Sequence, residues 1–300
     1  MKIGLVTYAP EKVEGFDMHV YYSRRADGTV FPAAREMQND VTCFCNAKAI
    51  REDPSLAAVS TNGPALRQNR KINVPFDFIC PTNPEYRAKI FDYVEGLGEE
   101  KVEGVTLNLY HFPEEEFCVC PRCVELWRQS GLNWYDWRAQ IVTDFLKEVR
   151  NRIGSKPLYV NLLPDPVLGR ERFGYDFDAL AEYADVFVIP MFSKAYPSPW
   201  YWEMLARAFK SKLKKPVFTN LYVRGPNDDP HQVPTADQLL TVSVRIARTG
   251  VDGIIFLAEN AQRIRDFQKA AVQSTDVLAE LDGYGGDEVL NLVDNWRSLF

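Results

Sequence analysis

Short runs of β-branched and aromatic residues alternate with amphipathic stretches over most of the chain. The later apolar runs cover residues 102–110, 156–165, 184–192, 215–223 and 251–259. Between them, apolar residues recur every three or four positions, as on one face of a helix, in residues 133–154, 198–213 and 235–250. Strands that alternate with helices of this length predict βαβ units, and therefore a parallel sheet.

The first third of the chain continues this pattern less regularly. Residues 2–8 and 40–46 predict two further strands, and residues 83–98 predict a helix capped by Asn83. These make seven strands, and residues 17–22 are a candidate for an eighth. We expect an α/β fold, a TIM-type (β/α) barrel with long loops after its strands, and either eight strands or an irregular seven.

Length and composition favour one barrel domain that spans residues 1–300. The chain has 300 residues, of which 46% are hydrophobic, and single barrels commonly reach this length around one core. Residues 47–82 are rich in turn residues and have no period, which indicates a loop insertion. Residues 276–300 predict a C-terminal helix, interrupted at 282–287, that packs on the outside of the barrel.

Charge and hydropathy exclude several kinds of partner. A net charge of −6 and a pI near 5.3 do not suit a nucleic-acid backbone, which requires clustered Lys and Arg. No apolar run approaches the roughly 20 residues that span a bilayer. Glu11 and Glu14 come too early for the apolar segment of a secretion signal. We expect a cytoplasmic protein without nucleic-acid or membrane partners, and leave open whether it is a homo-oligomer.

The ends of the predicted strands carry polar side chains at alternating positions. Side chains of a barrel strand point alternately inward and toward the helices, and active sites of this fold lie at the carboxyl ends of the strands. The inward positions near those ends are Asn108, Tyr110, Asn161, Asn220, Tyr222 and Arg224. We interpret them as contacts for a polar ligand. The alternative is that the asparagines hydrogen-bond one another in the core.

Three carboxylates are candidates for catalysis. Glu259 follows the last strand, where it can act as nucleophile, general acid or acceptor for a sugar hydroxyl, or can simply cap the next helix. Asp165 lies in the segment LLPDP, which is also ordinary turn sequence. Glu115 belongs to the run Glu114–Glu116 after the strand 102–110, and three adjacent acids are also typical of a solvated loop.

Five of the six cysteines have the spacing of metal ligands. They are Cys43, Cys45, Cys118, Cys120 and Cys123. The first two end one predicted strand and the other three follow the next one. Because loops after neighbouring strands meet at the same rim, four of these thiolates can enclose a tetrahedral zinc with a structural role. Disulfides or free buried thiols are the alternatives, and Cys80 is either a substitute ligand or a small core residue.

Two further side chains are candidates for substrate contacts. His111 directly follows Tyr110 and points either at the substrate or toward the thiolates, whereas His19 and His231 stand in loop contexts typical of the surface. Trp200 lies in the aromatic segment AYPSPWYW, where its ring can stack on a sugar face or dock the following helix on the barrel.

The order of these motifs resembles a family of glycoside-hydrolase-like TIM barrels. In that family a strand ending in Asn precedes a "CPN-PeYR" segment, a "DGIxLD" strand and a "CxCxxC" segment. The matching residues here are Asn46, Asp53–Pro54, Asn62–Gly63, Cys80–Arg87, Glu103–Gly104, Cys118, Cys120 and Cys123, and residues 174–192 resemble a later family segment. The resemblance implies the barrel fold and a carbohydrate substrate.

One position departs from that family. Asn108 stands where the family has Asp, and an amide is neither an ionised nucleophile nor a general acid. We therefore expect a glycosidase that acts on an oligosaccharide or glycoconjugate through other carboxylates, Glu259 among them. The alternatives are a carbohydrate-binding barrel that has lost catalysis, and a hydrolase of a non-sugar substrate that uses the metal directly.

Overall fold

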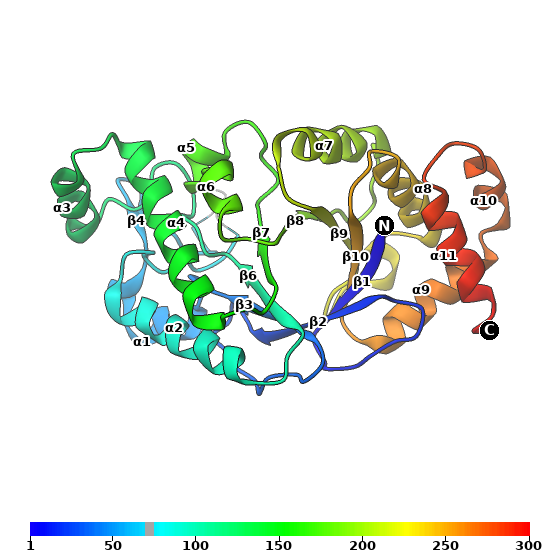
Figure 1. Ribbon diagram of the computed structural model, residues 1–300, viewed down its shortest axis with the longest axis horizontal. Coiled ribbons are helices and arrows are strands. Elements are labelled where there is room, and N and C mark those ends of the chain that lie inside the picture. Colours follow the sequence, from blue (N-terminus) through cyan, green and yellow to red (C-terminus); the bar gives the residue numbers. More distant parts are fainter. Residues whose placement is uncertain (70–74) are drawn as a thin grey trace. The chain divides into compact units, whose positions relative to one another are not determined.

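The computed structural model describes residues 1–69 and 75–300, and its main feature is a closed barrel of eight strands (Figure 1). The strands are β1 (Lys2–Thr7), β2 (Met18–Arg24), β3 (Gln38–Thr42), β6 (Gly104–Asn108), β7 (Leu158–Asn161), β8 (Val186–Met191), β9 (Val217–Arg224) and β10 (Gly253–Ala258). They follow the order β1-β10-β9-β8-β7-β6-β3-β2 around the barrel. The predicted α/β barrel is confirmed, and the candidate strand at 17–22 is β2.

The chain divides into two compact units, and each unit has its own set of helices. One unit comprises residues 1–22, 162–166 and 186–300, and the other comprises 23–161 and 167–185. The helices of the first unit are α7 (Pro199–Lys212), α8 (Ala236–Ala247), α9 (Ala261–Gln273), α10 (Thr275–Leu281) and α11 (Asp287–Arg297). Those of the second unit are α1 (Ala47–Glu52), α2 (Pro84–Glu99), α3 (Pro121–Ser130), α4 (Trp134–Ile153), α5 (Gly169–Phe173) and α6 (Phe177–Ala181).

The helices begin where the sequence supplies caps. The Oδ1 atom of Asn83 accepts the backbone N–H of Tyr86 at 2.9 Å and so starts α2, as predicted. Thr235 and Gln238 form a reciprocal capping box at the start of α8. α2 and α4 pack against each other in their unit, and α7 packs against α8 in the other.

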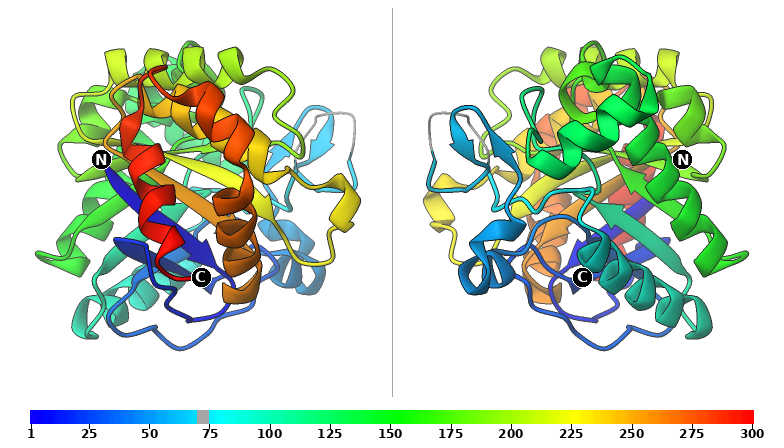
Figure 2. Two further views of the ribbon diagram at one scale, coloured as in Figure 1. Left: turned by 90° about the vertical axis from the view of Figure 1, so that its right-hand side faces the viewer. Right: turned by 90° about the vertical axis from the view of Figure 1, so that its left-hand side faces the viewer.

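The C-terminal segment forms two helices rather than one. Gly283, Gly285 and Gly286 all have positive φ, a conformation that favours glycine, and they separate α10 from α11. Both helices pack against α8 (Figure 2, left, brown to red). The buried Trp296 of α11 donates its indole N–H to the carbonyl of Gly15 at 3.1 Å. The break between α10 and α11 covers residues 282–286, where the interruption is expected.

Two connections of the barrel contain no helix. Residues 8–17 link β1 to β2, and residues 25–37 link β2 to β3, and all of them are described. The predicted insertion 47–82 contains α1, a 3₁₀ turn (Pro54–Leu56) and the small antiparallel pair β4 (Val59–Ser60) and β5 (Gly63–Pro64). Its residues 70–74 lie outside the described residues. No helix in the described part of the chain is long and apolar enough to cross a bilayer.

Register explains how the barrel orients its polar residues. Val41 pairs with Leu107, and Leu107 with Val160, and all three side chains are fully buried. Successive strand residues point to opposite faces of a sheet. Asn108 and Asn161 directly follow Leu107 and Val160, so their side chains lie on the opposite face of the barrel wall from those two.

Candidate functional site

A buried carboxyl and a buried amide meet on the barrel strands of the second unit. Asn161 at the end of β7 donates from Nδ2 to Oδ2 of Asp40 on β3 at 3.4 Å, and the two residues are only 6% and 3% exposed. The remaining Oδ1 atom of each has no hydrogen-bond donor among the described residues. Burial raises the pKa of Asp40 well above the usual range of a carboxyl, and the hydrogen bond from Asn161 only partly opposes this.

Asn161 was predicted to lie in a ligand site, whereas Asp40 was not identified. Asp40 stands at the start of the predicted strand 40–46, where it looks like a polar boundary residue. The structure places it within β3. Aspartate is rare inside strands, so its presence within a strand is itself unusual. Asp40 shares a strand face with Thr42, and this position could have identified it as a candidate site residue.

The strand β9 carries three of the predicted polar residues in the first unit. Asn220 is 6% exposed, and its Oδ1 atom has no donor among the described residues. Tyr222 donates its hydroxyl to the carboxylate of Asp228, which also accepts from the backbone N–H of Gly225 at 2.9 Å. Arg224 ends the strand and donates to the carbonyl of Asp228 at 3.2 Å. The loop after β9 is therefore folded around Asp228.

Asp228 was not identified from the sequence, because NDDP reads as turn sequence. Lys194, in the loop after β8, pairs with its Oδ1 atom at 2.9 Å. Burial opposes ionisation of Asp228, but the hydrogen bonds from Tyr222 and Lys194 outweigh burial and lower the pKa of this carboxyl. The ionised Asp228 therefore links the loop after β8 to the loop after β9, both in the first unit.

Glu259 and Asp165 lie in that same unit. Glu259 follows β10 directly, its side chain is about one third exposed (34%), and its carboxylate lies 3.8 Å from the guanidinium of Arg263, one turn into α9. Asp165 is half-buried in the turn after β7, where its backbone N–H donates to the carbonyl of Leu163 at 2.7 Å. The helix α9 is capped by Asn260 rather than by Glu259.

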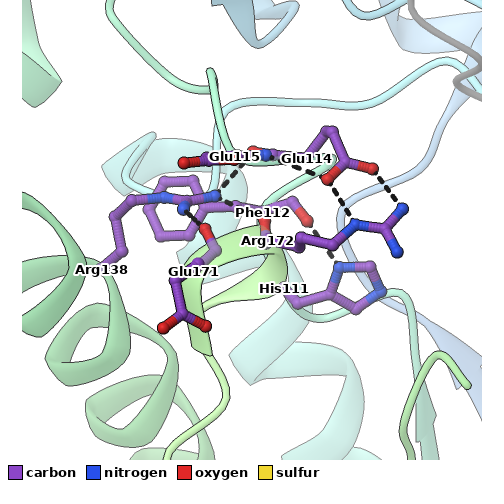
Figure 3. Close-up of polar contacts among 7 residues, drawn as sticks. All are labelled: His111, Phe112, Glu114, Glu115, Arg138, Glu171 and Arg172. Atoms are coloured by element: carbon purple, nitrogen blue, oxygen red, sulfur yellow. Dashed lines mark hydrogen bonds and ion pairs between the residues drawn. The ribbon is translucent and has the colours of Figure 1, made fainter. Parts of the chain in front are cut away.

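The run of three glutamates is a bound loop rather than a free one. Glu114 forms a two-pronged ion pair with Arg172, in which Nε and Nη2 lie 2.7 and 2.6 Å from the two carboxylate oxygens (Figure 3). Glu115 is exposed, and its carboxylate accepts the hydroxyl of Tyr135. Glu114 and Glu116 are half-buried, so Glu115 is the most exposed of the three acids.

Arg138 of α4 binds the backbone of this loop. Its guanidinium donates to the backbone carbonyls of Glu114, at 2.6 Å, of Arg172, at 2.7 Å, and of Glu171 (Figure 3). It also lies 4.7 Å above the ring of Phe112. Burial lowers the pKa of Arg138 to about 10, so the side chain stays charged at neutral pH.

His111 and Tyr110 are buried behind that loop. His111 is 1% exposed, and its Nδ1 donates to the carbonyl of Phe112 at 2.6 Å (Figure 3). The rings of Phe173 and Tyr175 lie 5.3 Å from its own. Burial lowers the pKa of His111 to about 4, so the imidazole is neutral at pH 7. The Tyr110 hydroxyl has no partner among the described residues.

Four thiols gather at one point of the second unit. They belong to Cys80, Cys118, Cys120 and Cys123, and their sulfur atoms all lie within 4.8 Å of one another. The Cys80 sulfur lies 3.8 Å from that of Cys120 and 3.4 Å from that of Cys123. None of the six cysteines, all of them described, is in a disulfide.

The membership of this group corrects the sequence-based ligand set. Cys43 and Cys45 are buried outside it, and Cys80, treated above as a substitute, is inside it. The reason is backbone pairing: the N–H of Cys43 donates to the carbonyl of Asn108 at 2.8 Å, which holds this segment in the barrel wall. Cys80 instead lies where the insertion returns to α2, beside the loop of Cys118.

The aromatic residues just before α7 and in its first turn divide into a buried and an exposed set. Tyr196 is buried, donates its hydroxyl to the carbonyl of Met191 at 2.9 Å and accepts the N–H of Tyr222 at 2.7 Å. Trp200 and Tyr201 are 62% and 41% exposed, and their rings are nearly perpendicular, with centroids 6.3 Å apart. The exposure of Trp200 disagrees with a role in docking the helix.

Comparisons with known proteins place the fold. No family model matches the chain, and no curated protein matches its sequence. The solved α-L-fucosidase isoenzyme 2 from Paenibacillus thiaminolyticus matches with a TM-score of 0.62 and 11% identity, over 91% of this chain and 49% of the fucosidase. The β-galactosidase from the psychrophilic Marinomonas ef1 matches with a TM-score of 0.55 and 12% identity, over 96% of this chain and 61% of that enzyme. The chain thus spans about half to three fifths of these glycoside hydrolases and shares their barrel fold.

Proposed function

We propose that this chain is a glycoside hydrolase that acts on an oligosaccharide or glycoconjugate. The observation that supports this most strongly is a set of buried side-chain oxygens without hydrogen-bond partners among the described residues: Oδ1 of Asp40 and of Asn161 in one unit, and of Asn220 in the other. A buried acceptor left without a donor costs about 1–3 kcal/mol. Such atoms are tolerated where a ligand or water supplies the hydrogen, and sugar hydroxyls both donate and accept.

The carboxylates proposed for the chemistry are those at the ends of strands. Glycoside hydrolases work with a pair of carboxyl groups, one of which protonates the leaving oxygen while the other attacks or activates water. Glu259 is our first candidate, since it follows β10 directly and is partly open to solvent. Asp165, in the same unit, is the candidate for its partner, and Glu115 of the second unit is a further candidate for the chemistry. The names of the two fucosidase and galactosidase structures support this reaction class.

The residues proposed to bind the sugar are the polar and aromatic ones at the strand ends. In the second unit they are Asn108, Tyr110, His111 and Asn161, and in the first unit they are Asn220, Tyr222, Arg224 and, at the start of α7, Trp200. Amide side chains can bridge neighbouring hydroxyls, and an exposed indole can stack on the apolar face of a pyranose ring. Asp40, which carries a raised pKa, adds a carboxyl that can donate to the substrate rather than only accept.

The test of this function is hydrolysis of a panel of aryl glycosides. Glu259→Gln keeps the size of the side chain but cannot ionise, so we expect kcat to fall by about 10²- to 10⁴-fold. The matched control is Glu280→Gln on the exposed side of α10, which should retain full activity. Wild-type-like turnover by Glu259→Gln would contradict the role of Glu259.

The second candidate function is carbohydrate binding without turnover. The observation in its favour is Asn108 at the carboxyl end of β6, where the resembling family has an acid. Saturable binding of an oligosaccharide by the wild type, with no hydrolysis on the panel, would favour this function. Restored hydrolysis in Asn108→Asp would then show that this single amide accounts for the loss.

The four-thiol group is proposed to hold a structural zinc ion. A tetrahedral site with Zn–S bonds of about 2.3 Å has sulfur atoms about 3.8 Å apart, and the separations of 3.4 and 3.8 Å around Cys80 fit this arrangement. Four thiolates fill the coordination sphere, so such a zinc has no open position for a substrate. This disfavours a hydrolase that uses the metal directly. Unpaired thiols also suit a reducing, cytoplasmic setting.

A further inference from the structure

A cavity of about 330 Å³ lies beside the carboxyl ends of β2 and β3 in the second unit. It is lined by Arg24, the last residue of β2, and by side chains of α1 and α2. The connection from β2 to β3 contributes Gly28 and Val30 to its wall and contains no helix. The cavity is thus built at the end of the strands where this fold places its binding sites.

Arg24 is a buried cation without a counter-charge. The residue is only 5% exposed. Its guanidinium donates to the carbonyls of Thr42 and Cys43, the latter at 3.1 Å, and to the hydroxyl of Tyr86 at 2.5 Å. All these acceptors are neutral. Among the residues that the structure describes, no carboxylate forms an ion pair with Arg24, although a buried charge is costly unless it is paired.

Two lysines add to the positive charge of the same cavity. Lys48 of α1 and Lys89 of α2 both line it and are both exposed, and neither has an ion pair within the described residues. Glu52 is the single acid in the lining. Three cations against one acid give a local excess of positive charge in a chain whose net charge is −6.

The tyrosines supply surfaces and donors rather than charge. The Tyr86 ring lies 5.5 Å from the guanidinium carbon of Arg24, which fixes the plane of that guanidinium. Tyr93 donates to the carbonyl of Phe31 at 3.3 Å and closes the cavity against the β2–β3 connection. The planar donor fork of Arg24 is therefore held rigidly while the lysines can move to meet a ligand.

We propose that this cavity binds an oxyanion, either a phosphate ester or a sugar carboxylate. An oxyanion supplies the negative charge that Arg24 lacks, and its oxygens accept charge-assisted hydrogen bonds from a guanidinium and from ammonium groups. The proposal stands without the glycosidase function, since every residue that carries it lies in one cavity with its own charge balance.

The experiment is isothermal titration calorimetry of the full chain at constant ionic strength, which measures the affinity for inorganic phosphate and, separately, for sodium glucuronate. Saturable binding is expected, and the tighter of the two anions identifies the source as an ester or a uronate. Lys48→Gln and Lys89→Gln should each weaken that binding about twofold to fivefold, because each removes one partly screened charge. Glu52→Gln should strengthen it by a similar factor.

The matched control is Lys147→Gln on α4, an exposed lysine outside the cavity with the same change of net charge. It should leave the affinity unchanged. The absence of saturable binding of both anions, or an equal loss of affinity in Lys147→Gln and Lys89→Gln, would overturn the proposal. Arg24→Lys, checked for folding by circular dichroism, should weaken binding more than either lysine variant. If Arg24→Lys does not fold, the comparison of Lys89→Gln with Lys147→Gln tests the proposal by itself.

Discussion

At the scale of single residues, Asp40 has the clearest physical consequence. Its pKa is raised by burial, so the folded chain holds a proton that the unfolded chain releases at a lower pH. A carboxyl with a raised folded pKa contributes fully to stability below its ordinary pKa of about 3.9. Between the ordinary and the raised value the unfolded state binds fewer protons than the folded one, so stability falls as pH rises.

Asp40→Asn should remove this pH dependence. Asparagine keeps the shape and a hydrogen-bonding amide but cannot ionise. The free energy of unfolding, measured in urea at a series of pH values above 4, should fall for the wild type relative to the variant by up to about 1.4 kcal/mol per pH unit. The control Asp92→Asn, on the exposed face of α2, should keep the wild-type slope. Parallel curves for wild type and Asp40→Asn would contradict the raised pKa.

Strand alternation predicted some site residues and could not predict others. Asn161 and Asn220 were identified because inward and outward positions alternate with a fixed period, and both are buried with unpaired oxygens. The sequence does not single out Asp40 or Asp228. An acid at the start of a strand looks like an ordinary polar boundary residue, and an acid in NDDP looks like an ordinary turn residue. Their importance depends on burial and on partners distant in sequence, Asn161 and Lys194, which no local pattern encodes.

At the scale of elements, Arg138 couples α4 to the loop after β6. Its three carbonyl acceptors belong to Glu114 in the loop after β6 and to Glu171 and Arg172 in α5, so one side chain of α4 holds a loop and a short helix (Figure 3). The sequence predicted α4 from its apolar period. That period could not distinguish Arg138 from the half-buried Arg150 and Arg152 of the same helix, because the full burial of Arg138 depends on the segments that cover it.

Arg138→Gln should therefore destabilise the fold. Glutamine cannot reach all three carbonyls, and buried acceptors left without donors cost about 1–3 kcal/mol each. We expect the free energy of unfolding in urea to fall by roughly 3 kcal/mol. Arg128→Gln on the exposed face of α3 is the control and should change it by less than about 0.5 kcal/mol. A loss of similar size in both variants would show that Arg138 is not the fastening point.

The elements themselves were largely predictable, and the exceptions have a physical cause. Long periodic stretches, such as α4 and α8, follow from amphipathic spacing and caps. The sequence left the eighth strand undecided because β2 is bounded by two helix-free connections, so no βαβ rhythm marks it. The folding of residues 47–82 into α1 and the β4–β5 pair depends on contacts with other loops, which a local reading does not contain.

At the scale of the whole molecule, long-range cross-links decide which segments are held together. Cys80 precedes α2 and Cys118 precedes α3, so a metal in the four-thiol group would join the end of the insertion to the loop after β6. The sequence analysis predicts Cys43 and Cys45 as metal ligands because their close spacing in the chain is typical of such ligands. The structure favours Cys80, because β3 holds Cys43 in the barrel wall.

Zinc content in matched cysteine variants distinguishes these two ligand sets. We expect about one zinc per chain in the wild type and in Cys43→Ser, and a loss of zinc in Cys80→Ser, because a structural site requires all four ligands. Metal that binds only the folded state adds its binding free energy to stability. A strong chelator should therefore lower the midpoint of urea unfolding in the wild type and in Cys43→Ser but not in Cys80→Ser. Loss of zinc from Cys43→Ser with full retention in Cys80→Ser would instead restore the ligand set predicted from the spacing.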